Sequence, residues 1–490
     1  MKFRSVLSPL VALAFLIATC ATAAAQSLAT HQTWHYRLLH PSTLIDDCLI
    51  CDRPTLILPL RGSFDLVLLE QNSLNTRYEL TNIDFYVGSP DNPQYRVTGQ
   101  GTWQIGGEVA VVQTVTLQTI VQAPSGSASR TFTNVSQQVQ ALWPEFEVDL
   151  NDTAGLGSIY RLHIVAAPLR EVWLSTALGF NSTNGAGTVN AGDLISDTGR
   201  IVEPQGDLVR ALGLPSGAYT IDAVDVAPGG SVLFSLNQDV TSPALGLLHN
   251  GDVFSDHGLI VETNQVLMAA FGLAPPFQDV GLKGLQVMDN GEVLFTINKD
   301  VAAKGSGLTL THGDLLSNSG QIRKSNQNLL ARFQPGTNAN FGLKAFHLWP
   351  SGEVWFSVET GFNDTSLGPV GNGDLLSDQG FIVFDNVDLT TAFGPASTSA
   401  NLGLTSLFVV TDVVPPVPAP VLLPPAVPPG SSTGNVMLSW SAQGKVFQVN
   451  KSAVLSTSFT PASPIVPGTN WTDFGALPVN PIGFYRLRQW

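Results

Sequence analysis

Two short sequence motifs recur four times along this 490-residue chain. The first, which we call the octet, reads GDLISDTG, GDVFSDHG, GDLLSNSG and GDLLSDQG, beginning at Gly192, Gly251, Gly313 and Gly373. The second, the valine motif, reads EVWLST, SVLFSL, EVLFTI and EVWFSV, with valines 60, 61 and 61 residues apart at Val172, Val232, Val293 and Val354. Self-similarity at a fixed period predicts a solenoid, a propeller or another array of equivalent units.

Each copy predicts four strands and a short helix. In the third copy, GLQVMDNGEVLFTIN is typical of a hairpin, because Asn290-Gly291 supplies the positive φ of a tight turn. The octet and the short strand GQIRKS follow, and NQNLLARF predicts one or two helical turns with Asn as N-cap. We therefore expect an all-β fold in which residues 158–412 form one domain of four repeats.

This order of elements, in four copies, resembles the four-bladed β-propeller of the haemopexin type. The resemblance is architectural, covers residues 158–412 and implies a ring of four blades. The copies are longer than haemopexin blades, and they lack the cysteines that close the ring in that family. A further strand, LTSLFVV from Leu404, is left over: it either pairs with the first copy or forms a fifth blade with YRLHIVAAP.

Two further modules flank the repeats. Residues 26–157 contain β-rich runs such as RYELTNIDFYV and EVAVVQTVTLQTIVQ, which predict a β-sandwich-like domain. Residues 413–432 are proline-rich and predict a semi-rigid linker. Residues 433–490 resemble a small fibronectin-like module, in which Trp440 would fill the core and Tyr485 would tie down a corner.

The N-terminus is typical of a secretory signal peptide. MKFR supplies positive charge, VLSPLVALAFLIAT is apolar, and ATAAAQ predicts cleavage between Ala25 and Gln26, so residues 1–25 would be removed. A lipoprotein signal with Cys20 as the lipid acceptor is the alternative. We expect a secreted, extracellular or cell-surface protein, with a periplasmic location or a lipoprotein as alternatives. No later stretch approaches the ~20 apolar residues of a membrane helix.

After cleavage only Cys48 and Cys51 remain, in DDCLICD. In an oxidising compartment this spacing favours a local disulfide. A redox-active pair and a zinc site are the alternatives, but neither the strand and helix of a thioredoxin-like motif nor a second ligand pair is present. We expect the disulfide.

The chain is acidic, with 23 Lys and Arg against 38 Asp and Glu and a formal charge of −15. Without a basic run, nucleic acid is not expected as a partner. Polysaccharide or a surface protein is the expected partner, and the oligomeric state is left open. The loops after each valine motif differ among the copies and are rich in Asn, Asp and Thr, which makes them candidate ligand contacts.

The second residue of each octet is an aspartate, and it has two interpretations. A turn in which the carboxylate accepts backbone N–H groups explains it by folding alone. The weaker alternative is a metal site, with Ca²⁺ as the cofactor, formed by the four equivalent residues Asp193, Asp252, Asp314 and Asp374.

No catalytic residue and no organic cofactor is predicted. The chain has neither an H-E-x-x-H motif nor a phosphate-binding G-x-x-x-x-G-K-[ST] motif, and its histidines are scattered. We therefore expect a binding or structural protein, with carbohydrate or matrix as the ligand, and we expect no enzyme. The alternative is a secreted propeller-type hydrolase or lyase that degrades polysaccharide.

Overall fold

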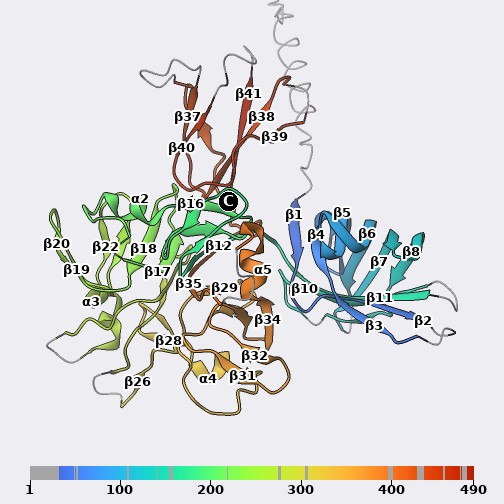
Figure 1. Ribbon diagram of the computed structural model, residues 1–490, viewed down its shortest axis with the longest axis horizontal. Helices are drawn as coiled ribbons and strands as arrows, with labels where there is room; N and C mark the ends of the chain where they lie inside the picture. Colours follow the sequence, from blue (N-terminus) through green and yellow to red (C-terminus); the bar gives the residue numbers. More distant parts are fainter. Residues whose placement is uncertain are drawn as a thin grey trace, which may run out of the picture.

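The structure is a computed structural model. It describes residues 32–48, 50, 53–107, 110–139, 141–153, 158–217, 219–273, 277–303, 307–395, 401–426, 435–455, 458–474, 476 and 483–490. The signal peptide with its cleavage residues Ala25 and Gln26, Cys20 and Cys51 all lie outside the described residues. The described chain is all-β, as the sequence predicts, and it comprises an N-terminal sheet, four repeated sheets and a C-terminal module (Figure 1).

The N-terminal part is a single antiparallel sheet that returns on itself. β1 pairs with both β4 and β11, so the path β1–β4–β5–β6–β7–β8–β10–β11 is closed, and β2 and β3 extend it beyond β11. Its strands are β1 (Thr33–Leu38), β2 (Thr43–Cys48), β3 (Leu56–Pro59), β4 (Arg61–Gln71), β5 (Asn75–Ser89), β6 (Asn92–Gly106), β7 (Val112–Ala123), β8 (Gly126–Thr133), β9 (Gln137–Gln138), β10 (Phe146–Asp152) and β11 (Ser158–Ala167).

This closed sheet differs from the β-sandwich-like domain expected from the sequence. The long strands are curved at irregular positions: the β5–β6 register shifts between Leu80 and Ile83, and Asn82 there has a φ of 52°. Gly62 in β4 has a φ of 130°, and a Cβ at this position would lie 2.1 Å from the carbonyl oxygen of Asp84. Bulges and glycine kinks bend a sheet, and here they let it close around one core of alternating inward side chains.

The sheet also extends past the expected boundary at residue 157. β11 carries the YRLHIV segment and pairs with β10, β2 and β1, so it belongs to the N-terminal sheet rather than to a fifth repeat. The repeat region therefore begins with β12 at Leu169.

The repeats form four four-stranded antiparallel sheets. The first sheet contains β12 (Leu169–Thr176), β15 (Leu194–Ser196), β16 (Arg200–Glu203) and β35 (Leu404–Thr411), and the second contains β17 (Ile221–Val226), β18 (Val232–Leu236), β21 (Val253–Ser255) and β22 (Ile260–Glu262). The third contains β23 (Gly284–Val287), β24 (Val293–Thr296), β27 (Leu315–Ser317) and β28 (Gln321–Lys324). The fourth contains β29 (Phe346–Leu348), β30 (Val354–Phe356), β33 (Leu375–Ser377) and β34 (Phe381–Phe384).

These four sheets form a closed ring. The edge strands β17, β23, β29 and β35 contact one another in that cyclic order, so they line the middle of the ring. β35 pairs along its length with β12 of the first repeat, although more than 200 residues separate them. The leftover strand LTSLFVV therefore completes the first sheet, which decides between the two pairings that the sequence left open.

The octet couples the strands within each sheet. Its sixth residue bonds to the valine motif: Val172 N donates to Asp197 Oδ1 at 2.9 Å, and Asp197 N donates back to the Val172 carbonyl at 3.0 Å. The same two contacts link Val354 and Asp378 in the fourth copy. This reciprocal pairing explains why the two motifs recur in register.

The aspartate at the second position of each octet has a different structural role. Asp314 Oδ2 accepts the N–H of Thr311 at 2.8 Å, and its Oδ1 accepts the N–H of Asn326, the first residue of a short helix, at 3.1 Å. Equivalent pairs of contacts occur in the other copies. The helices are α2 (Gln205–Arg210), α3 (Asn264–Leu267), α4 (Asn326–Leu329) and α5 (Asn386–Thr390). The aspartate thus joins the octet turn to a backbone donor that a helix start leaves free.

The variable loops form a hairpin in each repeat. Their strands are β13 (Phe180–Asn181) and β14 (Thr188–Val189), β19 (Val240–Ser242) and β20 (Gly246–Leu248), β25 (Val301–Ala302) and β26 (Thr309–Leu310), and β31 (Phe362–Asp364) and β32 (Gly368–Val370). Each hairpin contacts the helical corner of the preceding repeat; Asn184, for example, donates to the Ala392 carbonyl at 2.8 Å. Part of their polar surface therefore holds neighbouring repeats together.

The C-terminal module consists of two three-stranded sheets. Its strands are β36 (Val421–Leu422), β37 (Val436–Ser441) and β40 (Asn470–Asp473), facing β38 (Phe447–Ser452), β39 (Thr460–Pro461) and β41 (Phe484–Gln489). Trp440 is buried in its core as predicted, and the Tyr485 hydroxyl donates to Asp473 at 2.7 Å. β36 lies inside the expected linker, so that segment is part of the module rather than a spacer alone.

Asp412, directly after β35, joins all three parts of the chain. One carboxylate oxygen accepts the backbone N–H of His35 in the N-terminal sheet, and Arg170 of the ring donates to both oxygens. From the module, Arg488 and the indole N–H of Trp490 donate to the other oxygen at 2.9 and 2.7 Å. Burial acts to raise the pKa of Asp412, but the hydrogen bonds and charges of Arg170 and Arg488 outweigh it and lower the pKa.

Replacing an octet aspartate should destabilise the ring without involving a metal. Asp314→Ala leaves two backbone N–H groups without acceptors, so we expect a loss of about 2 kcal/mol in the free energy of unfolding, measured by urea denaturation. Asp289→Ala, an exposed aspartate of the same repeat, is the control and should change little. The Tm of the native chain should be the same with Ca²⁺ and with EDTA. If Ca²⁺ raised the Tm of the native chain but not that of Asp314→Ala, the metal interpretation would be favoured.

Removing the charge of Asp412 should release the module. Asp412→Asn leaves two arginines without their carboxylate, and breaking such a buried pair costs about 3 kcal/mol. We expect faster elastase cleavage within residues 413–434, which contain no trypsin site, and gel electrophoresis measures the rate. Asp473→Asn, which breaks an ion pair inside the module, is the control. An unchanged cleavage rate in Asp412→Asn would contradict this account of the junction.

Candidate functional site

A cavity of about 700 Å³ lies at one end of the ring's central axis. Its walls are the C-terminal ends of β17, β23, β29 and β35. The module closes over it with Lys445, Val446 and Trp490, and the segment after β35 contributes Val413 and Pro415. Volumes of about 300–1,000 Å³ are usual for small-molecule sites. The cavity thus lies where the ring and the module meet.

One equivalent position from every repeat lines this cavity. The valine of each valine motif pairs with one residue of the neighbouring inner strand. The residue just before that partner occupies the same place in every repeat and lines the cavity; it is Asp225, Gln286, His347 or Phe408. We call this the axial position. The octet is nearly constant among copies, but the axial position holds a carboxylate, an amide, an imidazole and a phenyl ring. The repeats therefore differ where their side chains converge.

Asp225 is paired with a residue of the module. Lys445 Nζ lies 3.3 and 3.4 Å from its two carboxylate oxygens and 3.2 Å from the Val287 carbonyl. The backbone N–H groups of Val226 and Val287 also donate to this carboxylate. Lys445 Nζ lies 6.0 Å from the ring centroid of Phe408, in a cation–π arrangement. The pair therefore adds no net charge to the cavity.

Two polar groups on the fourth repeat have no partner within the described residues. Part of the His347 side chain is open to the cavity, and neither of its ring nitrogens makes a hydrogen bond. Trp349 is 1% exposed, lines the cavity, and has a buried indole N–H without an acceptor. The two rings meet edge to face at 4.8 Å. Burial, with a smaller contribution from the charge of Lys445, lowers the pKa of His347 to about 3, so the imidazole is neutral.

A charged cluster lies toward the opposite end of the inner strands. Asp222, Lys283, Lys344 and Thr405 hold equivalent positions three residues before the axial one. Burial raises the pKa of Asp222 against the opposing charges of the two lysines, and burial lowers the pKa of Lys344. Lys283 also forms an ion pair with Glu359. These opposite charges compensate one another.

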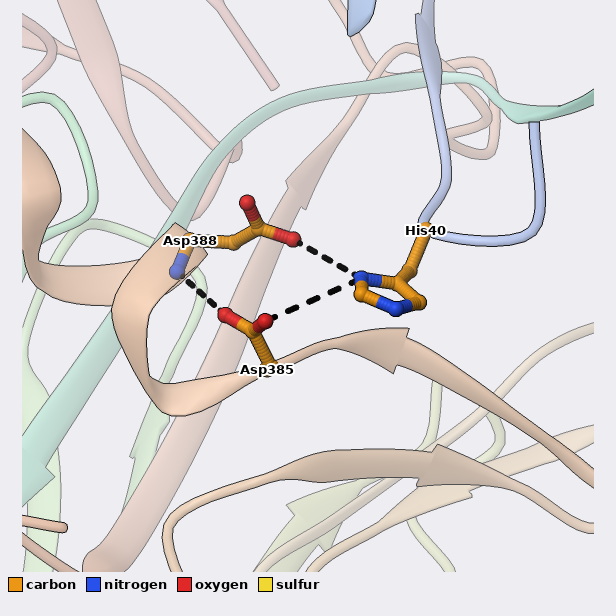
Figure 2. Close-up of side chains that lie close together, drawn as sticks. All are labelled: His40, Asp385 and Asp388. Carbon is orange, nitrogen blue, oxygen red and sulfur yellow. Dashed lines mark hydrogen bonds and ion pairs between the residues drawn. The ribbon is translucent and has the colours of Figure 1, made fainter. Parts of the chain in front are cut away.

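His40, Asp385 and Asp388 are the one group among the described residues whose ligand atoms are close enough for a metal ion (Figure 2). His40 Nδ1 lies 3.2 Å from Asp388 Oδ2 and 3.9 Å from Asp385 Oδ2. The guanidinium of Arg61 already supplies Asp388 with a cation at 3.0 Å, and Asp385 caps α5 by accepting the Asp388 N–H. We interpret this group as a contact between the N-terminal sheet and the ring.

The sequence-predicted site residues are not brought together. The octet aspartates directly precede strands of four different sheets, and each carboxylate is occupied by backbone N–H groups; they are Asp193, Asp252, Asp314 and Asp374. Cys48 ends β2 and is buried, while its expected partner Cys51 lies outside the described residues, so the disulfide stays a prediction. Sequence reasoning missed the axial position; an alignment of the first strands of the copies would have exposed its variation.

No protein-family model matches the chain, and no curated protein is detectably similar to it. Among the described residues, no helix has the length and hydrophobicity required to cross a membrane.

A buried carboxyl group, that of Glu145, lies between the N-terminal sheet and the ring. Glu145 is 5% exposed; its Oε1 accepts from the Ser351 hydroxyl at 3.2 Å, and its Oε2 is buried without a partner among the described residues. Burial, and then the nearby carboxylate of Glu353, raises the pKa of Glu145 to about 8. Glu145 therefore stays protonated at neutral pH in the folded chain, whereas in the unfolded chain it ionises near pH 4.3.

Glu145 should make the protein less stable as the pH rises. Because the folded state retains a proton that the unfolded state loses, stability falls between about pH 4.3 and pH 8. Glu145→Gln removes this dependence and should be more stable than the native chain by about 4 kcal/mol at pH 8 but only by about 1 kcal/mol at pH 5. Urea denaturation at both pH values measures it. Glu292→Gln is the control, because Arg323 lowers the pKa of Glu292 and the substitution should give no gain at pH 8.

Proposed function

We propose that this chain is an exported binding protein whose ligand site is the axial cavity between the ring and the C-terminal module. One observation carries the proposal: the axial position, which holds a different kind of side chain in each of the four repeats, converges on the cavity. Every repeat needs the same octet contacts to fold, so the octet is nearly constant. A single ligand on the axis does not share the symmetry of the repeats, so the side chains around it can differ.

We also propose a specific architecture for this site. The ring would be a four-bladed β-propeller of the haemopexin type, and the module would be a fibronectin-like sandwich. The cyclic order of the four edge strands, the closure of the first sheet by β35 and the two facing sheets of the module support this proposal. Binding at the end of a propeller axis agrees with the general rule that rigid scaffolds present variable residues.

Export is proposed from the N-terminal sequence, with its charged start, apolar stretch and small-residue cleavage site. Polysaccharide or a surface protein stays the predicted partner of the outer surface. The alternative, polysaccharide cleavage, has less support from the cavity. Glycosidases use two carboxylates, but the carboxylates that line this cavity are Asp225, paired with Lys445, and Asp289, exposed in a turn.

Adding a bulky side chain to the cavity wall should weaken binding. The purified mature protein, residues 26–490, would be titrated with the apolar probe N-phenyl-1-naphthylamine, and we expect a saturable fluorescence increase at one probe per chain. Val287→Trp adds bulk to the cavity wall at β23 and should reduce the affinity at least 10-fold. Val261→Trp makes the same change on the exposed β22 and should leave the affinity as it is. Binding that does not saturate, or that survives Val287→Trp in a folded protein, would contradict the proposal.

A further inference from the structure

The geometry points to an uncharged, largely apolar small molecule with a carbonyl or hydroxyl group as the ligand of the axial cavity. This inference rests on the proposed function and adds the chemical class of the ligand to it. Three features of the cavity support it: its charge, its lining and the His347 side chain, which has no hydrogen-bond partner among the described residues.

The charge of the cavity excludes an ionic ligand. Lys445 has three donor hydrogens, and its three acceptors are the two oxygens of Asp225 and the Val287 carbonyl. Asp225 in turn accepts two backbone N–H groups. An anion would have to compete with Asp225 for Lys445, and a cation would have to displace Lys445. Either exchange leaves a buried charge unpaired, which is costly.

The lining of the cavity favours apolar groups. Its wall includes Leu285, Phe346, Leu407, Phe408 and Val410, all of which are buried. Gln286 is polar, but its amide is bound at both atoms by the backbone of Leu348, at 2.7 and 3.2 Å. An apolar ligand therefore meets apolar side chains over most of its surface, with about 25 cal/mol gained per Å² removed from water.

One polar group remains to orient such a ligand. The His347 side chain is partly open to the cavity, and within the described residues its ring nitrogens make no hydrogen bond. Because burial lowers the pKa of His347 to about 3, the imidazole is neutral and offers one donor and one acceptor. A carbonyl or hydroxyl oxygen of the ligand can accept the imidazole N–H.

The experiment compares three fluorescent naphthalene probes on the purified mature protein. Prodan is neutral and has a ketone, N-phenyl-1-naphthylamine is neutral without one, and 1-anilinonaphthalene-8-sulfonate is an anion. We expect both neutral probes to bind at least 10-fold more tightly than the sulfonate. His347→Phe should weaken prodan about 3- to 10-fold, the value of one hydrogen bond, and leave N-phenyl-1-naphthylamine within twofold. His257→Phe, at an exposed octet turn, is the control for the loss of an imidazole.

The outcomes separate the two proposals. If no probe binds in a saturable way, the proposed function itself fails. If the probes bind but the sulfonate is as tight as prodan, the cavity is not selective for neutral ligands and the inference is wrong. An equal loss of prodan and N-phenyl-1-naphthylamine affinity in His347→Phe would also overturn it, because that result reflects a change in packing and not the loss of a hydrogen bond.

Discussion

The buried carboxylate of Asp412 is the contact on which the arrangement of this molecule depends. It follows β35, the strand that closes the ring, and its bonds reach the N-terminal sheet through His35 and the module through Arg488 and Trp490. Burying an aspartate is unfavourable unless its charge and lone pairs are compensated. Because these donors come from three parts of the chain, they meet only where the ring, the N-terminal sheet and the module are in contact. The axial cavity is likewise lined by both the ring and the module.

The repeats show two kinds of position with opposite rules. The aspartate at the second position of the octet is the same in every copy, because each copy must connect its turn to the start of its helix. The axial position is different in every copy, because its side chains share one space rather than four equivalent ones. Asp225 takes a partner from the module, and Gln286 bonds to the neighbouring strand. Within the described residues, the His347 ring nitrogens make no hydrogen bond. Local folding thus explains the constant residues, and convergence on the axis explains the variable ones.

Local features of the fold could be predicted from the sequence. The Asn290-Gly291 turn is present, with a φ of 82° at Gly291, and Trp440 is buried in the module. The short helices are present too, but the expected N-cap Asn326 is the first helical residue, and Ser325 before it accepts the Asn328 N–H. The sequence could not show which strands pair over long distances. The closure by β35, the curvature of the N-terminal sheet and the docking of Lys445 on Asp225 all depend on such pairings.

Hydrogen–deuterium exchange with and without N-phenyl-1-naphthylamine tests the central claim, that the ring and the module together enclose the ligand site. The account predicts ligand-dependent protection in the cavity-lining ends of the inner strands, residues 285–288, 346–349 and 407–411, and in residues 443–446 of the module. The hairpins between the second and third strands of each repeat should exchange as before. Protection confined to those hairpins, or to the module without the inner strands, would contradict the account.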